Sequence, residues 1–166
     1  MNDAKRSIEV RAGEWSFEVE VAGDVGAPLV LLLHGFPQTS DTWRDVLPAL
    51  ADAGYFAAAP NQRGYSPGAR PATVEEYATR LLVGDALALA DALDASRFHL
   101  VGHDWGGQLA WLIAAHHPER VRTLAVLSRP HPAAFAAAIR GDAAQSERSR
   151  HHRARRRRAP RRGHPG

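Results

Sequence analysis

Apolar and polar positions alternate at the start of the chain and give way to continuous apolar runs further on. Ser7–Arg11 and Trp15–Val21 alternate on either side of a short turn at residues 12–14, which predicts a half-buried hairpin. Leu29–Leu33 is apolar throughout, as in a strand covered on both faces of a parallel sheet. The hairpin is therefore expected at one side of a sheet, and the third strand inside it.

Strand and helix patterns alternate after this run. Ser40 is expected to cap a helix whose apolar spacing continues to Gly54, and a second helix is predicted over Val74–Leu93. The other predicted elements are strands at Tyr55–Ala59, Phe98–Val101 and Val121–Leu127 and a helix at Trp105–His117. Such alternation favours an α/β fold with a doubly wound, mostly parallel sheet and right-handed crossovers.

The composition changes abruptly near residue 143. Residues 1–142 hold 12 basic and 17 acidic residues, a net charge of −5, whereas residues 143–166 hold nine arginines and one glutamate, a net charge of +8. Alanine is the one apolar residue type left in that last segment, which therefore cannot bury a core. We predict a partial α/β domain over residues 1–142 and a disordered arginine-rich tail over 143–166.

The abrupt change favours a truncated or frameshifted product after about residue 140 over a selected basic arm, because a selected arm usually mixes in lysine. The overall net charge of +3 averages two unlike segments and does not indicate a nucleic-acid-binding domain. The absence of cysteine excludes a disulfide framework and a cysteine nucleophile, and fits a reducing cytoplasm. No apolar run approaches the ~20 residues that span a bilayer. We expect a cytoplasmic protein with no membrane segment, metal or cofactor.

The segment from Val101 to Gly107 carries the strongest chemical signal. It places Asp104 between a predicted strand and a predicted helix, with Gly102 and Gly106 two positions away on either side. This is the form of a nucleophile elbow, a strained turn whose neighbours must lack bulk. The carboxylate is then expected above the carboxyl edge of the sheet, where α/β folds bind ligands. The alternative is that Asp104 only caps the following helix.

The type of nucleophile limits the reaction. A carboxylate attacks a saturated carbon that bears a leaving group or belongs to a strained ring, and it leaves an alkyl ester on the enzyme. Epoxides and carbon–halogen bonds are therefore better candidate substrates than ordinary esters or amides.

A second candidate motif, His-Gly-Phe-Pro at residues 34–37, directly follows the buried strand. Its glycine turn can aim the Phe36 amide at the space above the sheet, where it would join the Trp105 amide in binding negative charge near Asp104. We interpret His34 as structural rather than as a general base.

The loop that follows the next predicted strand contains two further polar candidates. Arg63 is expected to anchor this Gly/Pro-rich loop through hydrogen bonds, with an anion clamp as the alternative. Ser66 is interpreted as an exposed loop serine without an adjacent base.

These motifs together resemble the α/β-hydrolase-fold epoxide hydrolases, of which the haloalkane dehalogenases are close relatives. The resemblance covers about Ser7–Arg140, and the Asp-Trp elbow is its most specific part. The matching segments are residues 34–37, 63–66, 102–107, 117–121 and 128–130. The resemblance implies the N-terminal part of an α/β-hydrolase-type fold, with the family's lid and final strands absent.

The resemblance also implies a two-step reaction on a small-molecule epoxide. Asp104 would open the ring and form the ester, the Phe36 and Trp105 amides would stabilise charge on its carboxyl group, and a histidine–acid pair would activate water. The family carries that pair after the strand matching Val121–Leu127, so turnover by this chain is expected to be slow. The tail histidines, to which we do not assign the base, are His151, His152 and His164.

Two alternatives remain open. Halide-cleaving relatives hold the leaving halide with the indole that Trp105 supplies here, so an alkyl halide is the alternative substrate, although Phe36 stands where such relatives often carry Asn. The second alternative is that the chain is a noncatalytic fragment whose arginine tail binds anions. In each case Val121–Leu127 would form an apolar sheet edge open to pairing with another chain.

Overall fold

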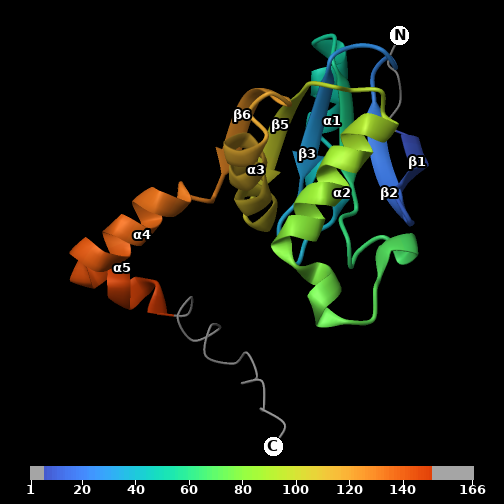
Figure 1. Ribbon diagram of the computed structural model, residues 1–166. Helices are drawn as coiled ribbons and strands as arrows, with labels where there is room; N and C mark the ends of the chain where they lie inside the picture. The colour runs from blue at the N-terminus through green and yellow to red at the C-terminus, as the bar shows by residue number, and fades with distance from the viewer. Residues whose placement is uncertain (1–5, 151–166) are drawn as a thin grey trace, which may run out of the picture. The chain divides into compact units, whose positions relative to one another are not determined.

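The computed structural model describes residues 6–150 and shows a six-stranded sheet with helices on both faces (Figure 1). The described residues divide into two compact units, one up to Arg129 and one from Pro130 onward. The strands are β1 (Arg6–Ala12), β2 (Trp15–Ala22), β3 (Leu29–Leu33), β4 (Phe56–Pro60), β5 (Phe98–His103) and β6 (Val121–Leu127). Every predicted strand is present, and its bounds differ from the prediction by at most two residues.

The sheet confirms the mostly parallel α/β architecture. Its strand order is β1-β2-β4-β3-β5-β6. β1 and β2 form an antiparallel hairpin, β2 is antiparallel to β4, and β4, β3, β5 and β6 run parallel to one another. The carboxyl ends of the central strands β3 and β5 therefore lie side by side at one edge of the sheet.

The apolar run of β3 serves two cores, one on each face of the sheet. Leu31 and Leu33 pack in the core beneath α2 (Thr79–Ala92) and α3 (Trp105–His116). Val30 and Leu32 pack in the second core with Leu47 of α1 (Val46–Asp52). Since alternate strand residues face opposite sides, a strand buried on both faces must be apolar at every position.

Two predicted helices are broken in the structure. Thr39, not Ser40, caps a short 3-10 helix, η1 (Ser40–Trp43), and α1 starts separately. Pro48 lies in the first turn of α1, where backbone N–H groups have no partner within the helix, so proline is tolerated there. A helix continuous from residue 40 would place Pro48 in its interior, where proline breaks a hydrogen bond.

The helix predicted over Val74–Leu93 is likewise two elements. Thr73 and Glu76 form a capping box on the 3-10 helix η3 (Val74–Tyr77), and Ala78 then takes an extended ψ of 136° before α2 begins. An extended residue cannot continue a helix, so the apolar spacing crosses a real break. One more 3-10 helix, η2 (Pro67–Ala69), lies in the loop after β4.

The second unit contains α4 (Pro132–Gly141) and α5 (Ala143–Arg148). For residues 143–148 the structure differs from the predicted disorder. The Asp142 carboxylate accepts hydrogen bonds from the Ala144 and Gln145 amides, and such a cap favours a helix start. Residues 151–166 of the predicted tail, which include His151, His152 and His164, lie outside the described residues.

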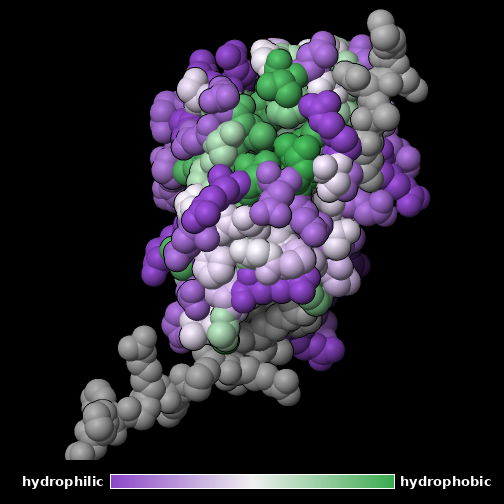
Figure 2. Space-filling model, turned by 90° about the vertical axis from the view of Figure 1, so that its right-hand side faces the viewer, coloured by the Kyte–Doolittle hydropathy of each residue, from purple (hydrophilic) through white to green (hydrophobic). Residues whose placement is uncertain are grey.

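The two edge strands of the sheet differ in polarity. Exposed β1 residues include Arg6, Glu9 and Arg11, and Figure 2, which faces the β1 side, shows an apolar area bordered by many hydrophilic side chains. β6 pairs with β5 on one side and has one charged residue, Arg122. Leu127 at its end is an exposed large apolar residue. Within residues 6–150, no helix is long and apolar enough to cross a membrane.

Candidate active site

Asp104 is the single residue between β5 and α3. Its φ of 50° and ψ of −110° lie outside the regions that residues with side chains ordinarily occupy. The backbone is fastened on both sides, because the Asp104 amide donates to the Leu127 carbonyl at 3.1 Å and the Asp104 carbonyl accepts from the Gln108 amide at 3.0 Å. The strained turn predicted from the sequence is therefore present and held by β6 and α3.

The glycines around the elbow are required by close backbone contacts. A Cβ on Gly102 would overlap the Gly106 carbonyl, and a Cβ on Gly106 would overlap the carbonyl of Leu33. A Cβ on Gly35 would lie 2.7 Å from the Asp104 Cβ. The strand end, the first turn of α3 and the loop after β3 thus meet without room for a methyl group.

The Asp104 carboxyl group faces the loop after β3. Its Oδ1 accepts a hydrogen bond from the Phe36 amide at 3.2 Å. Among the described residues, this carboxyl makes no capping hydrogen bond to α3, although Asp104 occupies the cap position. The helix-cap alternative for its side chain is therefore wrong, because the side chain bonds to a segment 68 residues earlier in the sequence.

The structure brings Phe36, Asp104 and Trp105 together at the carboxyl ends of β3 and β5. The Phe36 side chain is 62% exposed and the Trp105 side chain 44% exposed, so both reach solvent beside a half-buried Asp104. The Phe36–Pro37 peptide is cis. The Tyr65 ring lies 4.6 Å from the His34 ring, centre to centre. Burial, and after it the negative charge of Asp104, raises the pKa of Tyr65.

His34 is buried and fully engaged below the site. Its Nε2 accepts from the Gln62 amide at 3.1 Å, so the proton resides on Nδ1, which donates to the Gly35 carbonyl at 2.9 Å. Burial lowers the pKa of His34 and favours the neutral ring. The Gln62 side chain also donates to the His34 carbonyl at 2.7 Å. These contacts agree with the structural interpretation of His34; nothing in the sequence singled out Gln62.

Arg63 anchors its loop, as expected, but through a partner that the sequence analysis missed. Its Nε and Nη2 donate to the two carboxylate oxygens of Asp85 in α2 at 2.7 and 2.6 Å, and its Nη1 donates to the Glu76 carbonyl at 2.7 Å. Burial raises the pKa of Asp85, and the hydrogen bonds from Arg63 oppose that shift. An acidic residue on the apolar face of a helix was the available signal for such a pair.

Ser66 is buried, so its interpretation as an exposed serine is wrong. Its hydroxyl donates to the Asn61 carbonyl at 2.5 Å and accepts from the Glu18 amide at 2.9 Å. A small hydroxyl with two backbone partners can be buried at little cost. The side chain ties the β4 loop to β2 and is not a nucleophile.

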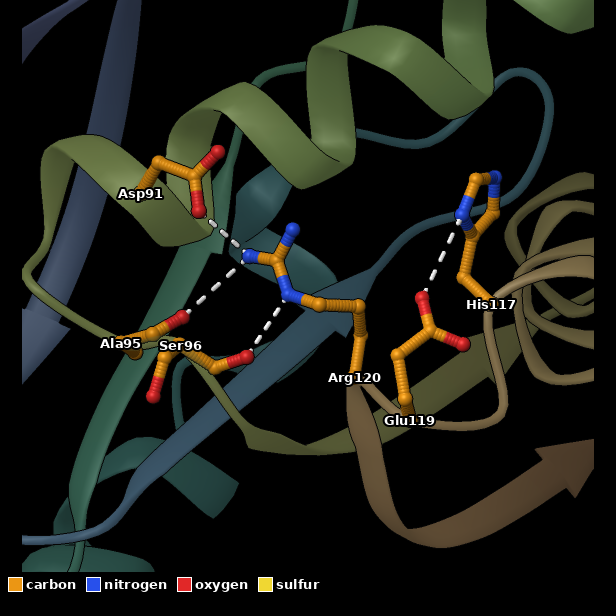
Figure 3. A network of polar contacts seen from close by, with 6 residues as sticks. All are labelled: Asp91, Ala95, Ser96, His117, Glu119 and Arg120. Atoms are coloured by element: carbon orange, nitrogen blue, oxygen red, sulfur yellow. Dashed lines mark hydrogen bonds and ion pairs between the residues drawn. The ribbon is translucent and has the colours of Figure 1, made fainter.

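A histidine–carboxylate pair lies at the far end of α3. His117 Nδ1 is 3.8 Å from Glu119 Oε1, next to Arg120 (Figure 3). Arg120 donates to the Ser96 carbonyl and to Asp91 Oδ1, which joins the start of β6 to the end of α2. Asp104 precedes the first residue of α3 and His117 follows its last, and a helix of this length measures roughly 18 Å. This pair cannot assist Asp104.

The geometry defines a half-buried carboxylate above a parallel sheet, steadied by a backbone amide and bordered by two exposed aromatic side chains. In the part of the chain that the structure describes, no group of three His, Cys, Asp or Glu residues could hold a metal ion. Such a carboxylate can attack carbon as a nucleophile, and its amide neighbour can stabilise charge on the resulting ester.

Comparison with known proteins gives the same fold. A family model described as the alpha/beta hydrolase fold matches residues 28–159, so the chain belongs to this family. It is 47% identical over 109 residues to "Epoxide hydrolase A" of Mycobacterium tuberculosis, and 39% identical over 142 residues to "Epoxide hydrolase 4" of Mus musculus. The resemblance to epoxide hydrolases stated from the motifs is thereby confirmed.

Solved structures agree with the sequence relatives. Epoxide hydrolase A from Mycobacterium thermoresistibile superposes with a TM-score of 0.73 at 39% identity, covering 76% of this chain and 40% of that one. An epoxide hydrolase from metagenomes of hot environments gives 0.81 at 34% identity, covering 90% and 50%. The two curated relatives above are covered over 34% and 39% of their lengths, and 66% and 86% of this chain is matched. The chain thus spans between a third and a half of these relatives.

Proposed function

We propose that this chain carries the nucleophile of an epoxide-opening hydrolase, and that Asp104 forms an alkyl ester with the substrate. The observation that supports this most is the direction of the Asp104 carboxyl group, which leaves its own helix and accepts a hydrogen bond from the Phe36 amide. A positive φ at a residue other than glycine is a strained state that functional sites retain. The names of the relatives supply the substrate class.

The hydrogen bond distinguishes the two carboxylate oxygens. Oδ1 is the acceptor of the Phe36 amide, so Oδ2 is the oxygen free to attack an epoxide carbon. As the Oδ2–C bond forms, the C–O bond of the ring breaks, and the ring oxygen leaves as an alkoxide that takes a proton from solvent. Oδ1 becomes the ester carbonyl, and the Phe36 and Trp105 amides would hold the oxyanion when water adds to Cγ.

Hydrolysis of that ester needs a base, and the described neighbours of Asp104 offer a poor one. Both ring nitrogens of His34 bond to backbone groups, and His117 with Glu119 lies beyond the opposite end of α3. We infer that the ester forms and then persists, since general-base activation of water contributes ~10²–10⁴-fold to such a step.

The test is intact-mass measurement after incubation with styrene oxide. We expect a single adduct of the mass of the epoxide, located on Asp104 by peptide mapping, that Asp104→Ala abolishes. Asp94→Ala is the matched control, because Asp94 is an exposed aspartate that also has a positive φ, 56°, but lies at the end of α2. An adduct that survives in Asp104→Ala would overturn the proposal.

Dehalogenation is supported by one observation, the exposure of Trp105, which directly follows the nucleophile in the sequence. An alkyl bromide would give the same kind of ester and release bromide, which ion chromatography measures. We expect the epoxide to react faster, because Phe36 offers no side-chain donor to a halide. Faster bromide release than epoxide adduct formation would reverse this order.

We also propose that β6 pairs with a second copy of the chain and that the protein works in the reducing cytoplasm. The proposed pairing rests on the open side of β6 and the exposure of Leu127. Light scattering should then report a species larger than a monomer, which Leu127→Lys would reduce because a charged residue on an edge strand disfavours pairing with another chain. A monodisperse monomer would contradict the pairing.

A further inference from the structure

We propose that Arg129 is a positioning residue that holds the Trp105 indole against the first turn of α3, an inference that rests on the proposed role of Asp104. The Arg129 guanidinium carbon lies 5.7 Å from the centre of the Trp105 ring. Its Nε and Nη2 donate to Gln108 Oε1 at 3.1 and 2.9 Å. One side chain at the end of β6 therefore contacts two residues of α3 that lie next to the elbow.

The backbone brings Arg129 to this position and keeps it there. Ser128 has a positive φ of 55°, which turns the chain at the end of β6. The Arg129 carbonyl then accepts a hydrogen bond from the Trp111 indole at 3.2 Å. A Cβ on Gly107 would lie 2.9 Å from the Arg129 Cβ, so the helix surface is open where the arginine crosses it. These backbone features fix the main chain of Arg129 independently of the contacts of its guanidinium.

The chemistry of this contact suits arginine and not lysine. Residues three apart in a helix lie on the same face, so Trp105 and Gln108 present a ring and an amide oxygen side by side. A planar guanidinium can lie over the ring while two of its N–H groups donate to that oxygen. The compact ammonium of a lysine cannot make both contacts at once.

The consequence concerns the side chain that borders the nucleophile. Trp105 is 44% exposed, so without Arg129 its ring would be free to change rotamer beside Asp104. In this proposal a fixed Trp105 ring presents a constant surface to a substrate that is bound at Asp104. Within the described residues, Arg129 has no carboxylate at ion-pair distance, and it places a positive charge at the Trp105 ring.

The test is quenching of Trp105 fluorescence, isolated by subtracting the signal of a Trp105→Phe counterpart of each variant. Iodide and acrylamide are the two quenchers, one anionic and one neutral. In Arg129→Met we expect iodide quenching of Trp105 to fall about twofold, because the local cation is lost, and acrylamide quenching to rise, because the ring is uncovered. The matched control is Arg122→Met, which changes an exposed arginine of β6.

The same variants report on the reaction. We expect styrene oxide to alkylate Asp104 on the order of tenfold more slowly in Arg129→Met and Arg129→Lys than in the parent chain, since small displacements of a positioned group are costly. A purely electrostatic role would instead be rescued by Arg129→Lys. If Arg129→Met does not fold by circular dichroism, Gln108→Leu removes the amide oxygen and leaves the charge in place, and its acrylamide quenching must then rise.

The outcomes separate the two proposals. If the parent chain gives no adduct but the quenching changes as expected, the function proposed for Asp104 fails while the contact between Arg129 and Trp105 stands. If Trp105 quenching by both agents is the same in Arg129→Met, or in Gln108→Leu where Arg129→Met does not fold, as in the parent chain, the inference about Arg129 is overturned. A full rescue of alkylation by Arg129→Lys would overturn it as well.

Discussion

The two polar centres of the first unit, at Arg63 and at Asp104, are built in opposite ways. Arg63 and Asp85 are buried, and each atom of their bidentate contact has a short partner. Asp104 is half-buried and adopts a strained backbone conformation, and within residues 6–150 its carboxyl group accepts one hydrogen bond, of 3.2 Å. The first arrangement leaves no capacity for a ligand, whereas the second leaves one oxygen available.

This contrast shows where stability and chemistry reside in the fold. Removing one partner of a buried ion pair with saturated hydrogen bonds lowers the stability of the fold, because the other charge is left buried without compensation. A strained, half-buried carboxylate with one hydrogen bond contributes little to stability and can be removed with little loss. Mutations at the two centres should therefore separate unfolding from reactivity.

The largest effect is expected from breaking the buried pair. Asp85→Ala should lower the free energy of unfolding by ~3–5 kcal/mol, because Arg63 would keep a buried charge without a partner. Asp91→Ala, which removes the exposed partner of Arg120, should cost less than about 1 kcal/mol. Urea titration followed by circular dichroism measures both. Equal losses in the two variants would contradict the contrast.

The next effect concerns the crowded glycines of the elbow. Gly106→Ala should destabilise the protein by ~1–3 kcal/mol and distort Asp104, because its Cβ would overlap the Leu33 carbonyl. Gly84→Ala in α2 is the control: a Cβ there meets nothing within 4 Å, and alanine is the better helix former, so a gain of ~0.5–1 kcal/mol is expected. Thermal unfolding compares the two. An unchanged stability in Gly106→Ala would exclude the close contact.

A smaller and opposite effect is expected at the nucleophile. Asp104→Gly should stabilise the protein by about 1 kcal/mol, because glycine adopts a positive φ without strain, and should abolish alkylation by styrene oxide. Asp94→Gly should give a similar gain with alkylation intact, since Asp94 shares the positive φ but not the site. Loss of stability in Asp104→Gly would show that the strain is not where the backbone angles place it.

The smallest effect is the pH dependence of stability that His34 contributes. Burial lowers the pKa of His34 in the folded state, so the unfolded chain binds the proton more tightly, and stability should fall as the pH drops through about 6.5. His34→Gln should flatten this fall by less than about 1 kcal/mol between pH 7 and pH 6. His99, whose pKa is lowered by burial and by Arg122, should contribute a further part. Urea titrations at several pH values measure the slope, and an unchanged slope in His34→Gln would contradict the expectation.

Much of the fold followed from local patterns. The continuous apolar run of β3 and the glycine spacing around Asp104 each reflect a steric requirement that acts within a few residues. The burial of Ser66 did not follow, because it depends on the Glu18 amide, which lies far along the chain. The contacts of Arg129 were not predicted for the same reason, because they join the end of β6 to a helix some 20 residues earlier.

The site was predictable as a set of residues but not as an arrangement of bonds. Proximity of Phe36 to Asp104 was expected from two motifs at the ends of neighbouring strands. Which carboxylate oxygen accepts the hydrogen bond depends on the three-dimensional arrangement, and it is Oδ1. The Asp85 partner of Arg63 was missed because only the fold shows which helix face meets the β4 loop.

The Phe36–Asp104 hydrogen bond gives the molecule a built-in spectroscopic reporter. An ester oxygen is a weaker acceptor than a carboxylate oxygen, so the amide proton resonance of Phe36 should move upfield when the nucleophile is alkylated. With phenylalanine labelled in ¹⁵N, one cross-peak would follow the charge state of the site in real time, without a chromogenic substrate and without any change to the sequence.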